Sequence, residues 1–323
     1  MLSAAVLEDF RASRRGQVIL PADPGYEEAR RVHNAMVDKH PALIVRCAGV
    51  ADVIASIQFA RKQNLTASVR GGGHNVAGIC LCDGLVIDLS SMRSVHVNPT
   101  ARTVRVEGGA TWQDVNDELQ PFGLAAAGGY VGTTGVGGLT LGGGLGWMVR
   151  KHGLALDNLL SADLVTADGR LLTASSVQNP DLFWAIRGGG GNFGVATSFE
   201  FRVHEAGTVL AGLVLHPASA GAQALRFWRD YERTAPEEMS NGALLFTPPQ
   251  ELPLPEAIRA KPTVGIGEFT SARWRLPSTP FDRCAPSVRP LLTYFNPCLR
   301  VQRKRWPISS GHAACTATGN PAS

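Results

Sequence analysis

The sequence has little excess charge, no long hydrophobic run and few cysteines. Its 31 lysines and arginines nearly balance 27 acidic residues over 323 positions, giving a formal charge of +4. So small and dispersed a charge does not favour nucleic acid or a membrane surface as a partner. Because no run of about 18 apolar residues occurs, no transmembrane helix is expected. Residues 1–16 place acidic side chains where a signal peptide needs an apolar segment, so a cytoplasmic location is expected.

The six cysteines lack the spacing of a disulfide framework or a zinc site. Cys80 and Cys82 are two positions apart, but no second pair of ligands accompanies them. Both are therefore predicted to be small core residues. No cluster of histidine and acidic residues has usable ligand spacing, and no metal is expected.

Motifs of three other enzyme classes are also missing. The GK[ST] of a phosphate-binding P-loop and the GxSxG of a serine hydrolase do not occur. Residues 142–146 contain GxGxG, but the dinucleotide-binding pattern GxGxxG fails because Trp147 stands where glycine or alanine is needed. The sequence therefore does not favour these classes.

Glycine, in contrast, is abundant: 36 of the 323 residues are glycine, whereas its typical share is about 7%. One cluster lies in Val69–Gly78, VRGGGHNVAG, where three consecutive glycines allow positive φ and close approach of the backbone to a ligand. Successive N–H groups in such a turn suit a pyrophosphate, and Arg70 adds a permanent positive charge. With His74 beside it, the loop suggests a nucleotide cofactor with a reactive ring nearby. The alternative is a surface turn with an incidental histidine.

A second cluster places ten glycines among residues 128–146. No packed helix or ordinary strand is expected there, because such backbone suits close approach to something flat or charged. Thr133, Thr134 and Thr140 add hydroxyl groups within it. Six further histidines are expected in solvated or structural roles, namely His33, His40, His96, His152, His204 and His216.

Hydrophobic periodicity predicts the secondary structure. Helices are expected over residues 27–39, 53–63, 112–120, 182–187 and 220–234. Strands are expected over residues 42–47, 65–70, 85–89, 103–106, 159–166, 171–174, 195–203, 210–215, 242–247 and 263–267. The first strand, helix and strand form a βαβ unit that delivers the chain into the first glycine loop, at the strand end where ligands bind in α/β folds.

The character of the chain changes twice near its end. A domain boundary is expected near Gly207, and residues 207–267 begin a second α/β unit. From about residue 268 to 323 no helical or strand periodicity is found, and the segment is rich in Arg, Pro, Ser and Cys. It is interpreted either as a disordered basic tail or as out-of-frame translation, and the second is favoured.

Six ordered motifs carry a family resemblance. They are RGGGHN (70–75), DGLVIDLS (83–90), VEGGATWQDV (106–115), TTGVGGLTLGGGLGWMVRKHGLALDNL (133–159), TADGRLLTAS (166–175) and NPDLFWAIRGGGGNFGVATSFEF (179–201). Over residues 20–267 the chain resembles FAD-linked oxidases of the berberine bridge enzyme type, within the vanillyl-alcohol oxidase superfamily. The resemblance implies an α+β fold: a PCMH-type FAD-binding domain of two α+β subdomains over residues 1–206, with its core in 38–206. An incomplete α/β substrate domain would follow over residues 207–267.

The resemblance also implies a cofactor site. His74 would bond covalently to the 8α-methyl group of FAD. The position of a second, cysteine attachment reads Val131, so a single attachment is expected. Val195 would contact the adenosine side. The other residues expected to bind FAD are Arg70, Gly71, Gly72, Gly73, Asn75, Gly78, Gly132, Thr133, Thr134, Gly137, Gly138, Gly142, Gly143 and Gly146.

The implied activity is that of an FAD-dependent oxidoreductase. Hydride would pass from a C–H of an alcohol, sugar or secondary metabolite to the flavin, and O2 would reoxidise it to give H2O2. In relatives the catalytic base comes from the second domain, so no residue is assigned to that role. Two alternatives stay open: a truncated, catalytically silent flavin-binding module or pseudogene product, and a noncovalent NADPH-dependent reductase of the same fold.

Overall fold

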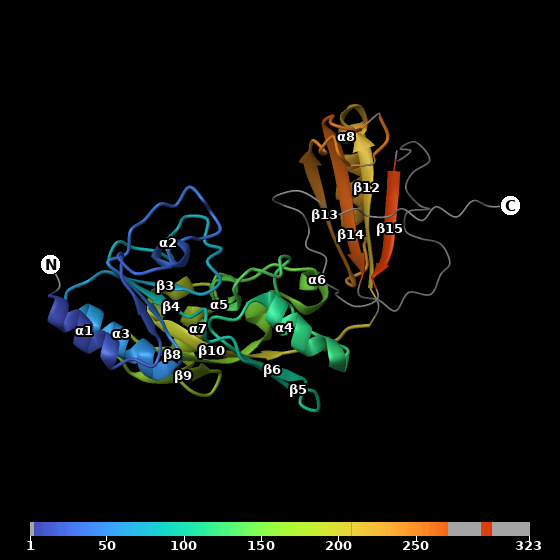
Figure 1. The fold of residues 1–323 in the computed structure, drawn as a ribbon. Helices are drawn as coiled ribbons and strands as arrows, with labels where there is room; N and C mark the ends of the chain where they lie inside the picture. Colours follow the sequence, from blue (N-terminus) through green and yellow to red (C-terminus); the bar gives the residue numbers. More distant parts are fainter. Residues whose placement is uncertain (1–2, 208, 253, 257, 271–291, 299–323) are drawn as a thin grey trace.

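The computed structural model describes residues 3–207, 209–252, 254–256, 258–270 and 292–298 (Figure 1). The strands of two sheets lie within residues 17–202. A third sheet, whose strands are longer, stands apart from them. The chain therefore has an α+β fold, as the sequence predicts. Among the described residues, none of the helices combines the length and apolar character needed to cross a membrane.

The first sheet has the strand order β1–β2–β4–β3, formed by Gln17–Ile19, Leu43–Arg46, Leu85–Asp88 and Ala67–Arg70. β2, β4 and β3 are parallel, and β1 is an antiparallel edge. Helix α3 (Val50–Lys62) joins β2 to β3, which confirms the predicted βαβ unit. Its buried residues Val53, Ile57 and Ala60 recur at helical spacing and join the core over the sheet.

Helix α1 (Ala4–Ala12) covers the outer side of α3. It begins at Ser3, whose side-chain oxygen accepts a hydrogen bond from the Val6 N–H, 3.3 Å away. Phe10 stacks on Phe59 of α3 with ring centroids 4.0 Å apart. The helix is therefore held both by its cap and by an aromatic contact.

The second sheet is fully antiparallel, with the order β5–β6–β10–β8–β9. Its strands are Val95–Asn98, Thr103–Glu107, Val195–Arg202, Leu159–Val165 and Leu171–Ser175. Helix α4 (Trp112–Leu119), predicted over residues 112–120, starts with a capping box between Thr111 and Asp114. Trp112 is buried against Phe201 of β10, with centroids 5.7 Å apart, so α4 is anchored to the sheet by its first residue.

Shorter elements complete this part of the chain. They are α2 (Tyr26–Ala29), α5 (Val136–Leu141), α6 (Val149–His152), α7 (Pro180–Ile186), the strand pair β7 (Leu124–Ala125) and β11 (His204–Glu205), and 3-10 turns η1 (Gln120–Phe122), η2 (Ala155–Asn158) and η3 (Gly190–Phe193). The presence of α5 corrects the expectation that no helix forms among residues 128–146. The helix is tolerated because Val136 and Leu141 are buried in the core, which offsets the cost of its two glycines.

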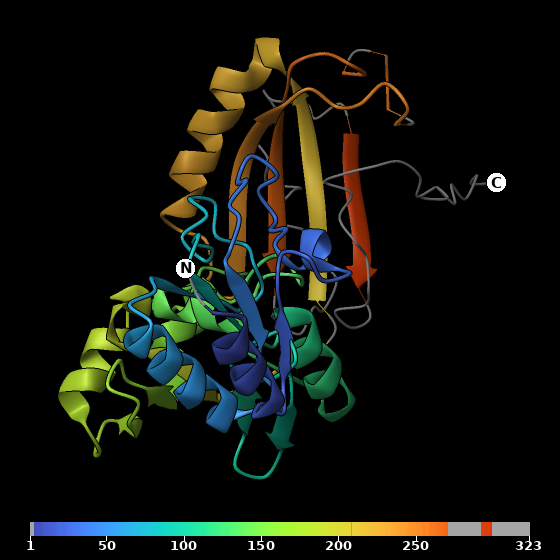
Figure 2. The same cartoon turned by 60° about the vertical axis from the view of Figure 1, so that its left-hand side comes forward.

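The third sheet has the order β13–β14–β12–β15 and is antiparallel throughout. Its strands are Met239–Phe246, Thr263–Thr270, Val209–Pro217 and Leu292–Cys298, and the 3-10 turn η4 (Ala218–Ala220) leads into helix α8 (Gly221–Glu232). Figure 2 shows α8 running along one face of this sheet. Ala224 and Trp228 of α8 pack with Ile266 of β14, so the helix covers part of that face.

Two strands correct the interpretation of the segment from about residue 268 onward. β14 continues to Thr270, and β15 pairs with β12 along its whole length. The prediction that the segment contains no strand is therefore wrong for Leu292–Cys298, because pairing with β12 supplies an order that periodicity does not reveal. Residues 271–291 and 299–323 lie outside the described residues.

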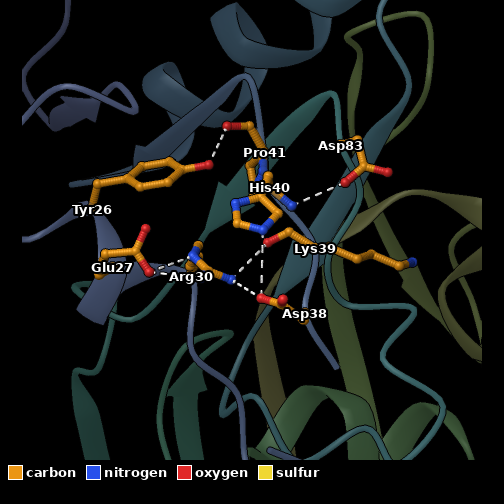
Figure 3. Close-up of polar contacts among 8 residues, drawn as sticks. All are labelled: Tyr26, Glu27, Arg30, Asp38, Lys39, His40, Pro41 and Asp83. Carbon is orange, nitrogen blue, oxygen red and sulfur yellow. Dashed lines mark hydrogen bonds and ion pairs between the residues drawn. The ribbon is translucent and has the colours of Figure 1, made fainter. Parts of the chain in front are cut away.

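The predicted helix over residues 27–39 is wrong after its first turn. α2 ends at Ala29. The side chain of Arg30 then forms ion pairs with one residue before it and one after it in the chain. Its guanidinium lies 2.6 Å from Glu27 Oε2 and 2.5 Å from Asp38 Oδ1 (Figure 3). A straight helix would carry Arg30 and Asp38 apart along its axis, so these ion pairs favour a loop that folds back.

The end of this loop is tied to the first sheet. The Tyr26 hydroxyl donates to the carbonyl oxygen of Pro41 at 2.7 Å, and the His40 N–H donates to Asp83 Oδ1 at 3.0 Å (Figure 3). Earlier in the loop, the side-chain amide of Asn34 donates to a carbonyl of the segment after β3, 2.8 Å away. Tertiary contacts thus override a local helical pattern.

A partly buried histidine pair lies near the last strand of this part of the chain. His152 and His204 stack with centroids 3.7 Å apart, and His204 Nε2 lies 2.7 Å from Asn158 Oδ1. The Asn158 amide nitrogen donates to the carbonyl oxygens of His152 and Leu154, so its oxygen accepts the proton of His204 Nε2. Burial, the neighbouring His152 and nearby cations lower the pKa of His204 to about 4.

We expect the free energy of unfolding to decrease as the pH falls from about 6.5 to about 4, because only the unfolded chain readily protonates residue 204 in that range. Above this range the contribution is fully present, and below it the contribution is lost. One proton gives a slope of at most about 1.4 kcal/mol per pH unit, which solvent screening reduces for this partly exposed ring. His204→Gln removes that part of the slope, as urea unfolding at several pH values would measure.

The matched control is His96→Gln, since His96 is exposed on β5. That variant should keep the wild-type dependence of stability on pH. An identical slope in His204→Gln and the wild type would contradict the role given to the histidine pair.

Candidate functional site

The RGGGHN loop (residues 70–75) follows directly from the carboxyl end of β3. Gly73 has φ of +69°, a left-handed conformation that favours glycine, and its carbonyl oxygen accepts the N–H of His33 at 3.0 Å. The carbonyl oxygen of Asn75 accepts the Gly78 N–H at 3.1 Å and closes the next turn. The loop is therefore built by backbone hydrogen bonds and needs glycine where the chain reverses.

The glycine tract (residues 128–146) meets this loop backbone to backbone. A Cβ at Gly72 would lie within 3.0 Å of Gly135 N, and a Cβ at Gly135 would lie equally close to Gly72 N. Gly135 is held in place because it bridges to Thr111, and the next N–H donates to the carbonyl of Ala110 at 2.9 Å. Only glycine on both sides permits this contact.

His74 lies at the junction of the two segments. Its Nε2 is 2.9 Å from the hydroxyl oxygen of Thr133, and its ring stacks on that of His33, with centroids 4.2 Å apart and planes 12° apart. Burial lowers the pKa of His74, and the neighbouring His33 lowers it further. The imidazole is therefore neutral at neutral pH, with one ring nitrogen able to act as a nucleophile.

Arg70 lies beneath the loop. Its guanidinium donates to the carbonyl oxygen of Ala29, and a Cβ at Gly73 would lie 3.4 Å from its Nε. That Nε is buried and has no hydrogen-bond partner among the described residues, and the same holds for Thr140 Oγ1 in α5. Buried polar atoms normally have partners, so both are available to a bound group.

Exposed apolar side chains follow both glycine segments. Val76 and Ile79 lie after the RGGGHN loop, with 76% and 71% of their surface exposed. In the glycine tract and just after it, Tyr130 packs edge to face on Trp147 with centroids 4.8 Å apart, and Trp147 lies 5.5 Å from Phe269 of β14. Apolar surface of this kind around a polar loop is typical of a ligand-binding region.

Several predicted site glycines are packed against the protein itself. Each would bring a Cβ within 3.3 Å of a neighbouring group: Gly71 against the Gly108 carbonyl, Gly78 against Val37, Gly132 against Gln113, Gly137 against the Gly108 carbonyl, and Gly146 against the Gly128 carbonyl. At Gly146 packing alone requires glycine, because the added atom would overlap backbone, whereas at Gly71 and Gly137 the neighbour would have to move by only a few tenths of an ångström.

Other predicted residues keep an open side. A Cβ at Gly138 would have nothing within 4 Å, and one at Gly142 or Gly143 would come no closer than 3.5 Å to any neighbour. The carbonyl oxygen of Thr134 accepts the Trp112 N–H at 3.0 Å. Val195 is buried in the core at the start of β10, where it pairs with Val165 of β8, so its side chain is not open to a ligand.

Sequence reasoning missed three features of this site. It assigned His33 a solvated or structural role, omitted Gly135, and did not connect Trp147 with Phe269. The glycine-rich sequence around Gly135 could have identified it as a site residue. His33 and Phe269 had none, because their partners are distant in the sequence.

The comparisons with known proteins agree with this geometry. Residues 41–175 match the profile of a family described as FAD binding domain. Over these residues the chain is similar to FAD-linked oxidoreductases. It is 41% identical over 194 residues to (R)-6-hydroxynicotine oxidase of Paenarthrobacter nicotinovorans, a match that covers 60% of this chain and 42% of that protein.

Solved structures extend the resemblance. The fold matches 6-hydroxy-D-nicotine oxidase from Arthrobacter nicotinovorans with a TM-score of 0.74 and 34% identity, over 80% of this chain and 56% of that one. It matches the BBE-like 1 protein of Physcomitrella patens with a TM-score of 0.79 and 25% identity, over 90% and 62%. The resemblance to berberine bridge enzyme-like oxidases that the motifs predicted is thereby confirmed. The chain spans about half the length of the curated relatives it matches, or somewhat less.

The residues present fit FAD. Arg70 supplies a fixed positive charge with an unpartnered Nε, Gly138 leaves one side of α5 open, and exposed apolar side chains flank the two glycine segments. These features match a cofactor with an anionic pyrophosphate and a flat ring system.

A pair of glycine substitutions separates internal packing from cofactor binding. Gly72→Ala should lower the free energy of unfolding of the apoprotein by about 1–3 kcal/mol, because the new methyl group overlaps the backbone of Gly135. Gly138→Ala should leave that stability equal or higher by up to about 1 kcal/mol, since alanine is the better helix former. It should nevertheless weaken FAD binding. Urea unfolding and titration with FAD measure the two effects.

Gly242→Ala serves as the control, because a Cβ at Gly242 in β13 would also have nothing within 4 Å. This variant should bind FAD with the affinity of the wild type, within the error of the titration. Wild-type stability in Gly72→Ala would show that the two glycine segments do not meet as described.

Proposed function

We propose that this chain is an oxidase that transfers hydride from a C–H of an alcohol, sugar or secondary metabolite to FAD attached covalently to His74, with O2 as the electron acceptor. The observation that carries the proposal is the neutral imidazole of His74 at the junction of two glycine segments. When bound, FAD supplies the two-electron chemistry between substrate and O2.

The chain's own residues bind and orient the cofactor. Arg70 and the N–H groups of the RGGGHN loop favour the pyrophosphate, since they combine a fixed charge with backbone donors. Gly138, Gly142 and Gly143 let a flat ring approach the backbone. His74 prevents loss of the cofactor, because a covalent bond replaces a binding equilibrium. Val131 stands where a second attachment would require cysteine, so a single bond is proposed.

The substrate is proposed to lie where the glycine tract faces the third sheet. Trp147 contacts Tyr130 on one side and Phe269 of β14 on the other, so both parts of the chain contribute aromatic surface to one place. Trp147 and Tyr130 keep 43% and 50% of their surface exposed. Such a surface suits a substrate with a planar or apolar portion.

The first test is flavin fluorescence of the purified chain on a denaturing gel, beside His74→Ala. A fluorescent wild-type band that disappears in His74→Ala is expected, because only a covalent bond survives denaturation. His96→Ala, which removes an exposed imidazole of β5, should keep the band.

The outcomes separate the candidate functions. FAD that binds the wild type but washes out on denaturation would contradict the covalent bond and favour the noncovalent reductase branch. A fluorescent band without H2O2 production over a panel of alcohols, sugars and aromatic secondary metabolites would favour a catalytically silent flavin-binding module. H2O2 formation with one substrate class would support the oxidase and identify that class.

A further inference from the structure

His33 makes two contacts with the RGGGHN loop, one with Gly73 and one with His74. Its N–H donates to the carbonyl oxygen of Gly73 at 3.0 Å, and its ring stacks on the His74 ring almost in parallel. The segment that carries His33 is a loop rather than a helix because Arg30 binds Glu27 and Asp38 across it (Figure 3). The loop that replaces the predicted helix therefore places an imidazole on one face of His74.

Thr133 contacts the same ring at one edge. Its hydroxyl oxygen lies 2.9 Å from His74 Nε2, which prevents a carbon atom from reaching that nitrogen. Nδ1 of His74 makes no hydrogen bond among the described residues. With one ring face covered by His33 and one nitrogen occupied by Thr133, Nδ1 is the ring nitrogen open to a reaction partner.

We propose that His33 and Thr133 are positioning residues for flavin attachment, and that they direct Nδ1 of His74 toward the 8α carbon of FAD. In the reactive tautomer Nδ1 carries the lone pair, while Nε2 carries the proton and donates it to Thr133 Oγ1. Neither residue bonds to the cofactor. The inference rests on the proposed attachment through His74 and adds which residues orient the reacting ring.

The attachment balances with O2 as the oxidant. The Nδ1–C8α bond forms while one C–H bond of the 8α-methyl group breaks. The imidazole, alkylated at Nδ1, gives up its Nε2 proton on the Thr133 side. The two hydrogens and two electrons removed in this step reduce the flavin ring, and O2 then accepts them to form H2O2. The oxidised, covalently bound cofactor results.

The test follows the rate at which full-length apoprotein incorporates FAD covalently, measured as acid-precipitable flavin. Thr133→Val removes the hydroxyl at nearly constant volume, and Thr133→Ser retains it. His33→Ala removes the stacked ring, and His33→Phe retains a ring. We expect Thr133→Val and His33→Ala to slow incorporation about tenfold or more, since misplaced reacting groups react far more slowly. The Ser and Phe variants should stay near the wild-type rate.

Two further measurements distinguish positioning from a general structural defect. Noncovalent FAD binding, followed by quenching of flavin fluorescence, should remain within about threefold of the wild type in all four variants. The flavin-bearing peptide, isolated by proteolysis and examined by NMR, should carry its bond at Nδ1. Thr100→Val, at an exposed threonine, is the matched control for loss of a hydroxyl.

The inference fails separately from the proposed function. Wild-type rates in Thr133→Val and His33→Ala, or a bond at Nε2, would overturn the positioning role while leaving covalent attachment intact. Equal slowing in the Phe and Ala variants of His33 would overturn the stacking contribution. A wild-type chain that binds FAD but never forms a bond would overturn the attachment itself, and with it this inference.

Discussion

The contact between Gly72 and Gly135 is the constraint on which the rest of the site depends. Because neither residue carries a Cβ, the loop after β3 and the tract before α5 can meet through their backbones. Gly135 is tied by its bridge to Thr111 at the start of α4. The contact therefore joins the parallel sheet, which delivers the loop, to the antiparallel sheet on which α4 packs. Thr133 reaches His74 as a consequence.

Two stacked histidine pairs in this chain illustrate how the same physics serves different purposes. In both pairs burial lowers a pKa and keeps an imidazole neutral. At His204 the Nε2 proton is directed to Asn158, which itself bonds to two backbone carbonyls, so the ring is part of a closed network. His74 keeps one nitrogen open. Its ring therefore has one nitrogen without a hydrogen bond among the described residues, whereas the Nε2 of His204 is bonded within the fold.

The residues that directly follow the glycine tract contact the third sheet and helix α8. Trp147 contacts Phe269 of β14, and α6 follows at once. In α6 Arg150 bonds to Glu232 at 2.6 Å and to the Ala235 carbonyl at 3.0 Å, both at the end of α8. The glycine tract and the residues that contact the third sheet and α8 are therefore consecutive in the sequence. A substitution in the glycine tract is therefore expected to alter the position of the third sheet, and the reverse.

The sequence by itself determined the elements whose signals are local: the helices α3 and α4, the strands β8 and β9, and the glycine segments with His74. It also determined the family, because six motifs occur in order. Only the tertiary structure decided that residues 30–39 form a loop, that Leu292–Cys298 pairs as a strand, and that His33 and Thr133 enclose His74. The physical reason is common to all three. Ion pairs, strand pairing and ring stacking join residues far apart in the chain, and local periodicity carries no record of them.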